Sequence, residues 1–151
     1  MTENNTINVE HVLPGETVYF NNLPVNEMDE ECIDLCVAMN NLPGVETVES
    51  CCGHFRNAFI IFFRCSNFKS LGILARVFDR RYSNTNKIWS ITAETADIEP
   101  CNSFLLSSNT AYEDEYQLKE DLHNIIENIK YWSDNKFKDY FKEFEYGTRV
   151  D

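Results

Sequence analysis

The feature that most constrains the fold is a pair of extended segments joined by a short turn that contains a glycine. Residues 45–50 and 58–65 have the composition of strands, and the turn between them is Cys52-Gly53-His54-Phe55-Arg56. Ala58–Phe63 is an uninterrupted apolar run, which is typical of a buried strand. The two segments therefore predict an antiparallel hairpin whose second strand lies in the core.

Helical patterns precede and follow this hairpin. Asn26 is the predicted N-cap of the first helix and Asn67 that of the second, while Thr110–Glu113 has the form of a capping box that opens a third. The predicted elements, in chain order, are a strand at 16–20, a helix at 27–41, strands at 45–50 and 58–65, a helix from 68, strands at 87–95 and 103–108, a helix at 111–132 and a last helix from 133.

This order predicts an α+β fold, with one mainly antiparallel sheet and helices packed on it. A chain of 151 residues is long enough for one hydrophobic core. We therefore expect a flexible N-terminus at 1–10, a single domain at 11–132 and a charged C-terminal helix at 133–151. The apolar run at 58–63 is too short to cross a bilayer.

Charge is distributed unevenly along the chain. The net charge is −12, which argues against general binding of DNA or RNA, because such binding depends on Lys and Arg. Residues 1–55 contain ten Asp or Glu and no Lys or Arg, whereas residues 56–87 contain seven Lys or Arg and one Asp. A basic segment between acidic flanks indicates a local anion site rather than an extended nucleic-acid track.

The turn after the first hairpin strand is the predicted binding site. Gly53 allows backbone amides to converge on an anion, while His54 and Arg56 offer positive charge. Ser107, at the end of a later strand, would form a second wall. We expect a small anionic, nucleotide-like ligand, and the predicted ligand-binding residues are Ser50, Cys52, Gly53, His54, Arg56, Arg64, Arg80, Arg81 and Ser107.

Three alternatives stay open at this point. Cys52 activated by His54 would make the protein a hydrolase or transferase. The acidic flanks would also suit an inhibitor that binds another protein. Finally, Gly53 would have a purely structural role if it only makes the turn.

Zinc is also considered, with Cys51, Cys52 and His54 joined by Cys65 or Cys101. Adjacent cysteines in a strand point to opposite faces, so only one of Cys51 and Cys52 is expected to reach a given site. The sequence also has no Cys-x-x-Cys pair. We therefore expect no metal and no cofactor.

The segment Met1–Asn5 lacks the features of a secretory signal, so we expect a cytoplasmic protein with reduced cysteines and no membrane partner. The last predicted helix carries four aromatic residues that would pack on the domain or on a second copy of the chain. These residues are Phe137, Tyr140, Phe141 and Phe144.

Met39-Asn40-Asn41-Leu42-Pro43-Gly44, followed by Ser50-Cys51-Cys52-Gly53-His54, resembles a motif shared by small, mostly uncharacterised phage and bacterial proteins. The similarity covers about residues 15–130. This resemblance implies a phage protein that sequesters a signalling nucleotide of host defence.

Ser50–His54 is also distantly similar to the Ser-Cys-Ser-Gly-Arg motif of the tRNA wybutosine-synthesising methyltransferase family, with His54 in place of the motif's arginine. This resemblance implies an α+β fold and nucleotide-cofactor chemistry.

Overall fold

The computed structural model of the chain describes residues 19–20, 23–94 and 102–136. The predicted N-terminus at 1–10 and nearly all of the predicted C-terminal helix, including its four aromatic residues, lie outside this range. The elements are β1 (Tyr19–Phe20), β2 (Leu23–Pro24), α1 (Glu30–Asn40), β3 (Val45–Cys51), β4 (Ala58–Cys65), α2 (Phe68–Val77), β5 (Ser90–Glu94), β6 (Ser103–Ala111) and α3 (Glu115–Tyr131).

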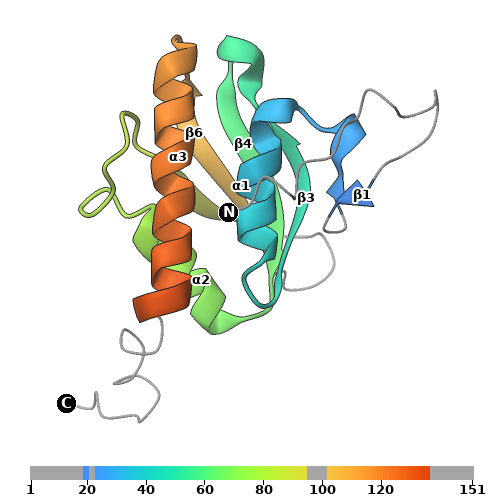
Figure 1. Ribbon diagram of the computed structural model, residues 1–151, viewed down its shortest axis with the longest axis vertical. Coiled ribbons are helices and arrows are strands. Elements are labelled where there is room, and N and C mark those ends of the chain that lie inside the picture. Colours follow the sequence, from blue (N-terminus) through green and yellow to red (C-terminus); the bar gives the residue numbers. More distant parts are fainter. Residues whose placement is uncertain (1–18, 21–22, 95–101, 137–151) are drawn as a thin grey trace.

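The main sheet has four antiparallel strands in the order β3-β4-β6-β5. It combines the hairpin β3–β4 with the hairpin β5–β6, while β1 and β2 pair in a separate, smaller sheet. Figure 1 shows α1 and α3 side by side over one face of the main sheet, with α2 near their lower ends. The predicted α+β class is confirmed, and so are the first hairpin and the bounds of β4.

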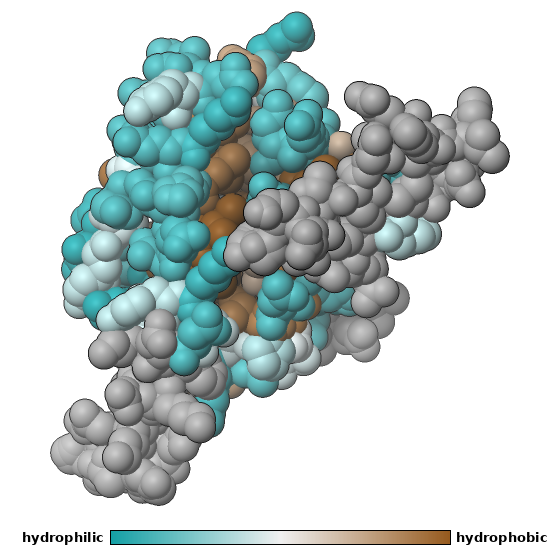
Figure 2. Space-filling view, in the orientation of Figure 1, coloured by the Kyte–Doolittle hydropathy of each residue, from teal (hydrophilic) through white to brown (hydrophobic). Residues whose placement is uncertain are grey.

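The core lies between this sheet face and the helices. Alternate residues of β4 (Phe59, Ile61 and Phe63) are fully buried, as period-two alternation requires of a strand covered on that face. Figure 2 shows apolar surface gathered in the seam between α1 and α3, with hydrophilic residues on their outer faces. The described residues include no helix that is both long and apolar enough to span a membrane.

Hydrogen bonds join the C-terminal end of α1 to the neighbouring strand β3. The side chain of Asn40 accepts the backbone N–H of Thr47 at 2.8 Å and donates to the Thr47 hydroxyl at 2.9 Å. Gly44 lies between the two elements with φ 75°, as the third residue of a turn in which the Val45 N–H donates to the Leu42 carbonyl at 3.2 Å, a position that favours glycine. The amide of Asn40 thus fixes α1 against β3.

The start of α3 differs from the prediction. Thr110 and Ala111 belong to β6, where Ala111 pairs with Ala58, so the predicted capping box at Thr110–Glu113 is wrong. The N-cap of α3 is Asp114, whose side chain accepts the N–H of Tyr116. Pairing with β4 therefore outweighs the local helix signal.

The start of α1 also differs from the prediction, and the end of α2 determines where Arg80 and Arg81 lie. Residues 25–27 form a short 3-10 turn, and α1 begins after Asp29 instead of at the predicted N-cap Asn26. Asn67 does cap α2 as predicted, by accepting the N–H of Ser70. Arg80 and Arg81 follow α2 in a separate turn, because the helix ends at Val77.

A buried polar network holds the loop before β5 against α3. The carboxylate of Asp121 is fully buried and accepts the backbone N–H groups of Asn86 and Lys87 at 2.6 and 3.2 Å. It also accepts the hydroxyl of Tyr112, which in turn accepts the indole N–H of Trp89. Burial and the neighbouring carboxylate keep the pKa of Tyr112 well above its usual value.

Candidate functional site

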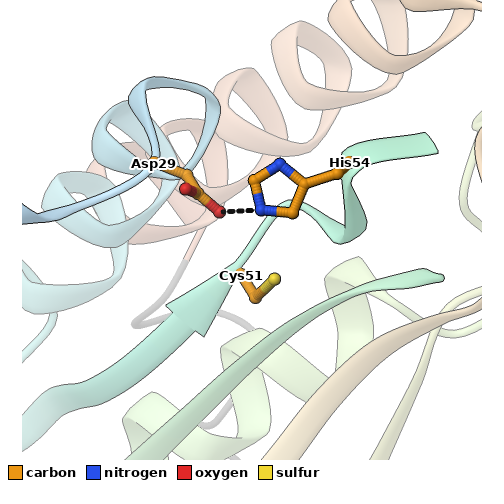
Figure 3. Close-up of side chains that lie close together, drawn as sticks. All are labelled: Asp29, Cys51 and His54. Atoms are coloured by element: carbon orange, nitrogen blue, oxygen red, sulfur yellow. Dashed lines mark ion pairs between the residues drawn. The ribbon is translucent and has the colours of Figure 1, made fainter. Parts of the chain in front are cut away.

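The candidate site lies where the β3–β4 hairpin turns, beside the N-terminus of α1. Figure 3 shows the side chains of Asp29, Cys51 and His54 converging there from the start of α1, the end of β3 and the turn. One carboxylate oxygen, the thiol sulfur and one imidazole nitrogen all lie within 4.8 Å of one another. Among the described residues, these three side chains form the group of His, Cys, Asp or Glu donors whose ligand atoms are close enough together to hold one metal ion.

The backbone of the turn is strained. Gly53, His54 and Phe55 follow one another with φ values of 81°, 52° and 62°, all in the left-handed region. Such a conformation is rare for residues with a Cβ atom and costs roughly 1–2 kcal/mol per residue. This backbone conformation places Nε2 of His54 3.5 Å from Asp29, while most of the His54 side chain stays exposed. Strain of this kind is typical of functional sites.

Asp29 is the residue of the candidate site that was not among the predicted site residues. Its side chain does not cap α1 but accepts the backbone N–H of Cys52 at 2.9 Å, and the same oxygen lies 3.5 Å from Nε2 of His54. The hydrogen bond from Cys52 N–H is the main cause that holds the pKa of Asp29 below its ordinary value. In the sequence, Asp29 is recognisable as an acidic residue near the start of a helix. This feature is common and does not by itself indicate a site.

Both vicinal cysteines border the site. The sulfur of Cys51 accepts the N–H of Gly53 at 3.4 Å, and the sulfur of Cys52 lies 3.6 Å from Nδ1 of His54. Cys51 alone of the two belongs to the group of possible metal ligands, in agreement with the expectation that only one would reach a given site, and Cys52 follows the strand with helical dihedral angles (φ −74°, ψ −6°). Alternation between sheet faces therefore ends at Cys51.

The two thiols differ in environment. Cys52 is buried, with 6% of its surface exposed, whereas Cys51 is partly exposed. Burial raises the pKa of Cys52 to about 11, so its thiol is neutral near pH 7. A neutral, buried thiol is a weak nucleophile, and this environment disfavours the predicted catalytic role of Cys52.

Several predicted site residues lie away from the turn. Ser50 pairs with the buried Ile61 in the β3–β4 ladder and therefore faces the core side of the sheet. Ser107 lies two strands from Cys51, a separation of about 10 Å at the usual strand spacing. Arg64 is six residues along β4 from Ala58, about 20 Å at the rise of a strand.

The basic residues of the 56–87 segment do not form one patch. Arg64 pairs with Glu46 at 3.8 Å, and Arg81 pairs with Asp79 at 2.7 Å in the turn after α2. Arg80 is exposed in that same turn. Of the predicted cations, Arg56 and His54 are the two that belong to the hairpin turn.

Three amides of the turn form hydrogen bonds within the protein. Cys52 N–H binds Asp29, Gly53 N–H binds the Cys51 sulfur, and Arg56 N–H binds the Gly53 carbonyl. The Asp29 carboxylate therefore occupies the position beside the turn at which the sequence predicted an external anion. By itself, that negative charge would repel an anionic ligand.

We expect the depressed pKa of Asp29 to be visible in the acid stability of the metal-free protein. Because the native pKa lies below the unfolded one, the ionised form adds stability above about pH 4, and this contribution is lost as the pH falls through the native pKa. Between pH 5 and 3, urea unfolding should therefore show a steeper fall in unfolding free energy for the wild type than for Asp29→Asn. Parallel curves would show that Asp29 is not held ionised by the turn.

The resemblances inferred from the motif at 42–54 stay expectations. No protein-family model matches the chain, and comparisons with curated proteins and with solved structures find no match either. The geometry around Asp29, Cys51 and His54 is therefore what supports a function.

Proposed function

We propose that the end of the β3–β4 hairpin is a mononuclear, zinc-type metal centre with one position open to a small anionic ligand. The observation that carries the proposal is the convergence of Asp29, Cys51 and His54, whose donor atoms lie within 4.8 Å of one another. Carboxylate, thiolate and imidazole are all zinc ligands in proteins, and three protein ligands are typical of a centre with an open fourth position.

The spacing of the donors fits such an ion. Zinc–ligand bonds of about 2.0–2.3 Å place tetrahedral ligands about 3.3–3.8 Å apart. The distance between Asp29 Oδ2 and His54 Nε2 is already 3.5 Å. A small inward rotation of the Cys51 side chain would complete the set.

Two of the ligand atoms already have supporting hydrogen bonds. Gly53 N–H donates to the Cys51 sulfur and Cys52 N–H donates to Asp29. Donors of this kind stabilise the charged form of a thiol or a carboxyl group, which is the form that binds metal. Such outer partners also orient the ligands.

Electrostatics favour a cation at this place. Asp29 and a Cys51 thiolate would together balance the charge of a divalent ion, and residues 1–55 contribute no Lys or Arg. The bound ion would also remove the repulsion that Asp29 exerts on an anion. A phosphate oxygen of a nucleotide-like molecule is therefore the ligand we propose for the open position, with Arg56 on the same turn.

The His54 side chain is 65% exposed, so solvent and small molecules have access to the open position. This access also leaves room for the hydrolase or transferase alternative, with a metal-bound water instead of Cys52 as the reacting group. Turnover of a phosphate ester would distinguish that activity from simple binding. We rank binding first, because the described residues supply the ligand set but no positioned general base.

Titration of the metal-free protein with Zn²⁺ and with Co²⁺ tests the proposal. We expect one ion per chain and a thiolate-to-cobalt absorption band. Cys51→Ser, Asp29→Asn and His54→Ala should each weaken binding by about 100-fold or more, since removing a ligand exceeds the 10–100-fold effect of an outer partner.

Cys65→Ser is the matched control, because Cys65 is a buried thiol at the opposite end of β4 whose sulfur contacts the Asn67 carbonyl. It should bind metal like the wild type. Equal binding by Cys51→Ser and Cys65→Ser would overturn the metal centre. Inorganic phosphate and AMP should then bind the metal-loaded protein only, and equal binding to the metal-free protein would overturn the role of the ion.

A further inference from the structure

We infer that Phe55 binds the base of a nucleotide whose phosphate occupies the open position of the proposed metal centre. This inference rests on the proposed function and deepens it, because it names the ligand as a nucleoside phosphate and not simply a phosphate ester. The observation behind it is a phenyl side chain that is 40% exposed, directly after the proposed ligand His54, on a backbone with φ 62°.

The fold itself gives no reason for a phenylalanine at this position. A positive φ is an outlier for a bulky residue, and glycine or asparagine would form the same turn at a lower cost in free energy. Burial in the core does not offset this cost, because in the described part of the chain Phe55 belongs neither to the core nor to the side chains packed against it. A strained, exposed aromatic residue beside a site is therefore expected to contact a ligand.

Phe55 lies within reach of a nucleotide held at the ion. His54 and Phe55 are consecutive, so their Cα atoms are about 3.8 Å apart, and both have left-handed φ values. In a helical turn, neighbouring side chains are about 100–120° apart around the axis, whereas in a strand they point to opposite faces. The turn therefore does not carry the Phe55 ring to the face opposite His54. Only one sugar separates the phosphate of a nucleotide from its base.

The turn thus offers three consecutive, exposed side chains to three parts of one molecule. His54 holds the ion that binds the phosphate, Phe55 stacks on the base, and the guanidinium of Arg56 binds a further phosphate oxygen. Every base has a π face, so Phe55 selects nucleotides over sugar phosphates without selecting strongly among the bases. The larger ring system of a purine offers more area for stacking than a pyrimidine does, so AMP is the probe of choice.

The first experiment compares two ligands that differ only in the base. The Zn²⁺-loaded protein is titrated in a calorimeter with AMP and with ribose 5-phosphate. We expect AMP to bind about 5–100-fold more tightly, which is the effect of stacking one base on an aromatic side chain. Phe55→Ala should bind the two ligands alike. Phe55→Tyr keeps an aromatic ring and should retain the preference for AMP.

The second experiment detects the stacking directly, by ¹H NMR of AMP bound to the Zn²⁺-loaded protein. Its H2 and H8 protons should move upfield in the wild type, because they lie over the face of a phenyl ring, and they should not do so in Phe55→Ala. Phe68→Ala is the matched control, since Phe68 is an exposed phenylalanine at the start of α2, whereas the turn lies before β4. It should behave like the wild type in both experiments.

Co²⁺ titration of the same variants separates this inference from the proposed function. Phe55→Ala should bind Co²⁺ like the wild type, because the phenyl ring is not part of the ligand set. If the wild type binds Co²⁺ but binds AMP and ribose 5-phosphate equally, the role of Phe55 is overturned and the metal centre stands. An unchanged preference for AMP in Phe55→Ala would overturn that role as well. If the wild type binds no Co²⁺, the metal centre fails, and the inference about Phe55 fails with it.

Discussion

Replacing Gly53 by alanine is expected to abolish metal binding and to lower the free energy of unfolding by about 2–4 kcal/mol. Gly53 has φ 81°, and a Cβ atom added to it would lie 2.8 Å from the carbonyl oxygen of Ala58, at the start of β4. The Ala58 carbonyl oxygen belongs to the backbone of a paired strand, so moving it away from the added Cβ atom would cost much free energy. The turn must therefore change shape, and with it the positions of Cys51 and His54.

Gly44→Ala is the matched control for this prediction. Gly44 has φ 75°, and a Cβ atom there would lie 2.8 Å from the Asn67 side chain, so the destabilisation should be of the same kind. Gly44 precedes β3, however, and the site lies beyond the other end of that strand. Urea unfolding and Co²⁺ titration of both variants should show two destabilised proteins, of which only Gly44→Ala binds metal. Wild-type affinity in Gly53→Ala would contradict the account of the turn.

Asp121→Asn is expected to cost about 3–5 kcal/mol of unfolding free energy, which corresponds to a fall of roughly 6–20 °C in melting temperature. The Asp121 carboxylate is fully buried and accepts from two backbone N–H groups, the Asn86 amide and the Tyr112 hydroxyl. Asparagine replaces one acceptor oxygen by an NH₂ group that faces donors. Buried donors would then be left without a partner.

Tyr112→Phe provides the comparison within the same network. It removes a single hydroxyl, which leaves Trp89 N–H without its acceptor and Asp121 with its other donors. Its cost should be smaller, about 1–3 kcal/mol. Thermal unfolding with a chelator present measures both variants. A cost below 1 kcal/mol for Asp121→Asn would show that the network does not hold the loop against α3.

The hairpin could be predicted from sequence because its signals are local. The apolar run of β4 and the glycine of the turn lie next to each other, and neither depends on distant residues to be recognised. The start of α3 could not be predicted in the same way. Whether Thr110 and Ala111 extend a strand or begin a helix is decided by pairing with Ala58, about 50 residues earlier.

The site was predicted in part for a related reason. Cys52, Gly53 and His54 are adjacent in the sequence and could be recognised there as one motif. Asp29 comes close to them only because α1 packs beside β3. The basic residues show the opposite case. Arg56, Arg64 and Arg81 belong to one basic segment of the chain, yet β4 separates Arg64 from Arg56, and Arg81 lies in the turn after α2.

Asn40 joins the last turn of α1 to β3, and Asp29, the N-cap of α1, accepts the N–H of Cys52 directly after the same strand, so this helix is held at both ends by one neighbour. A helix held in this way cannot swing outward as a lid. A ligand of the proposed metal centre would therefore enter and leave past the exposed His54 ring, with a side-chain movement and no rearrangement of the domain.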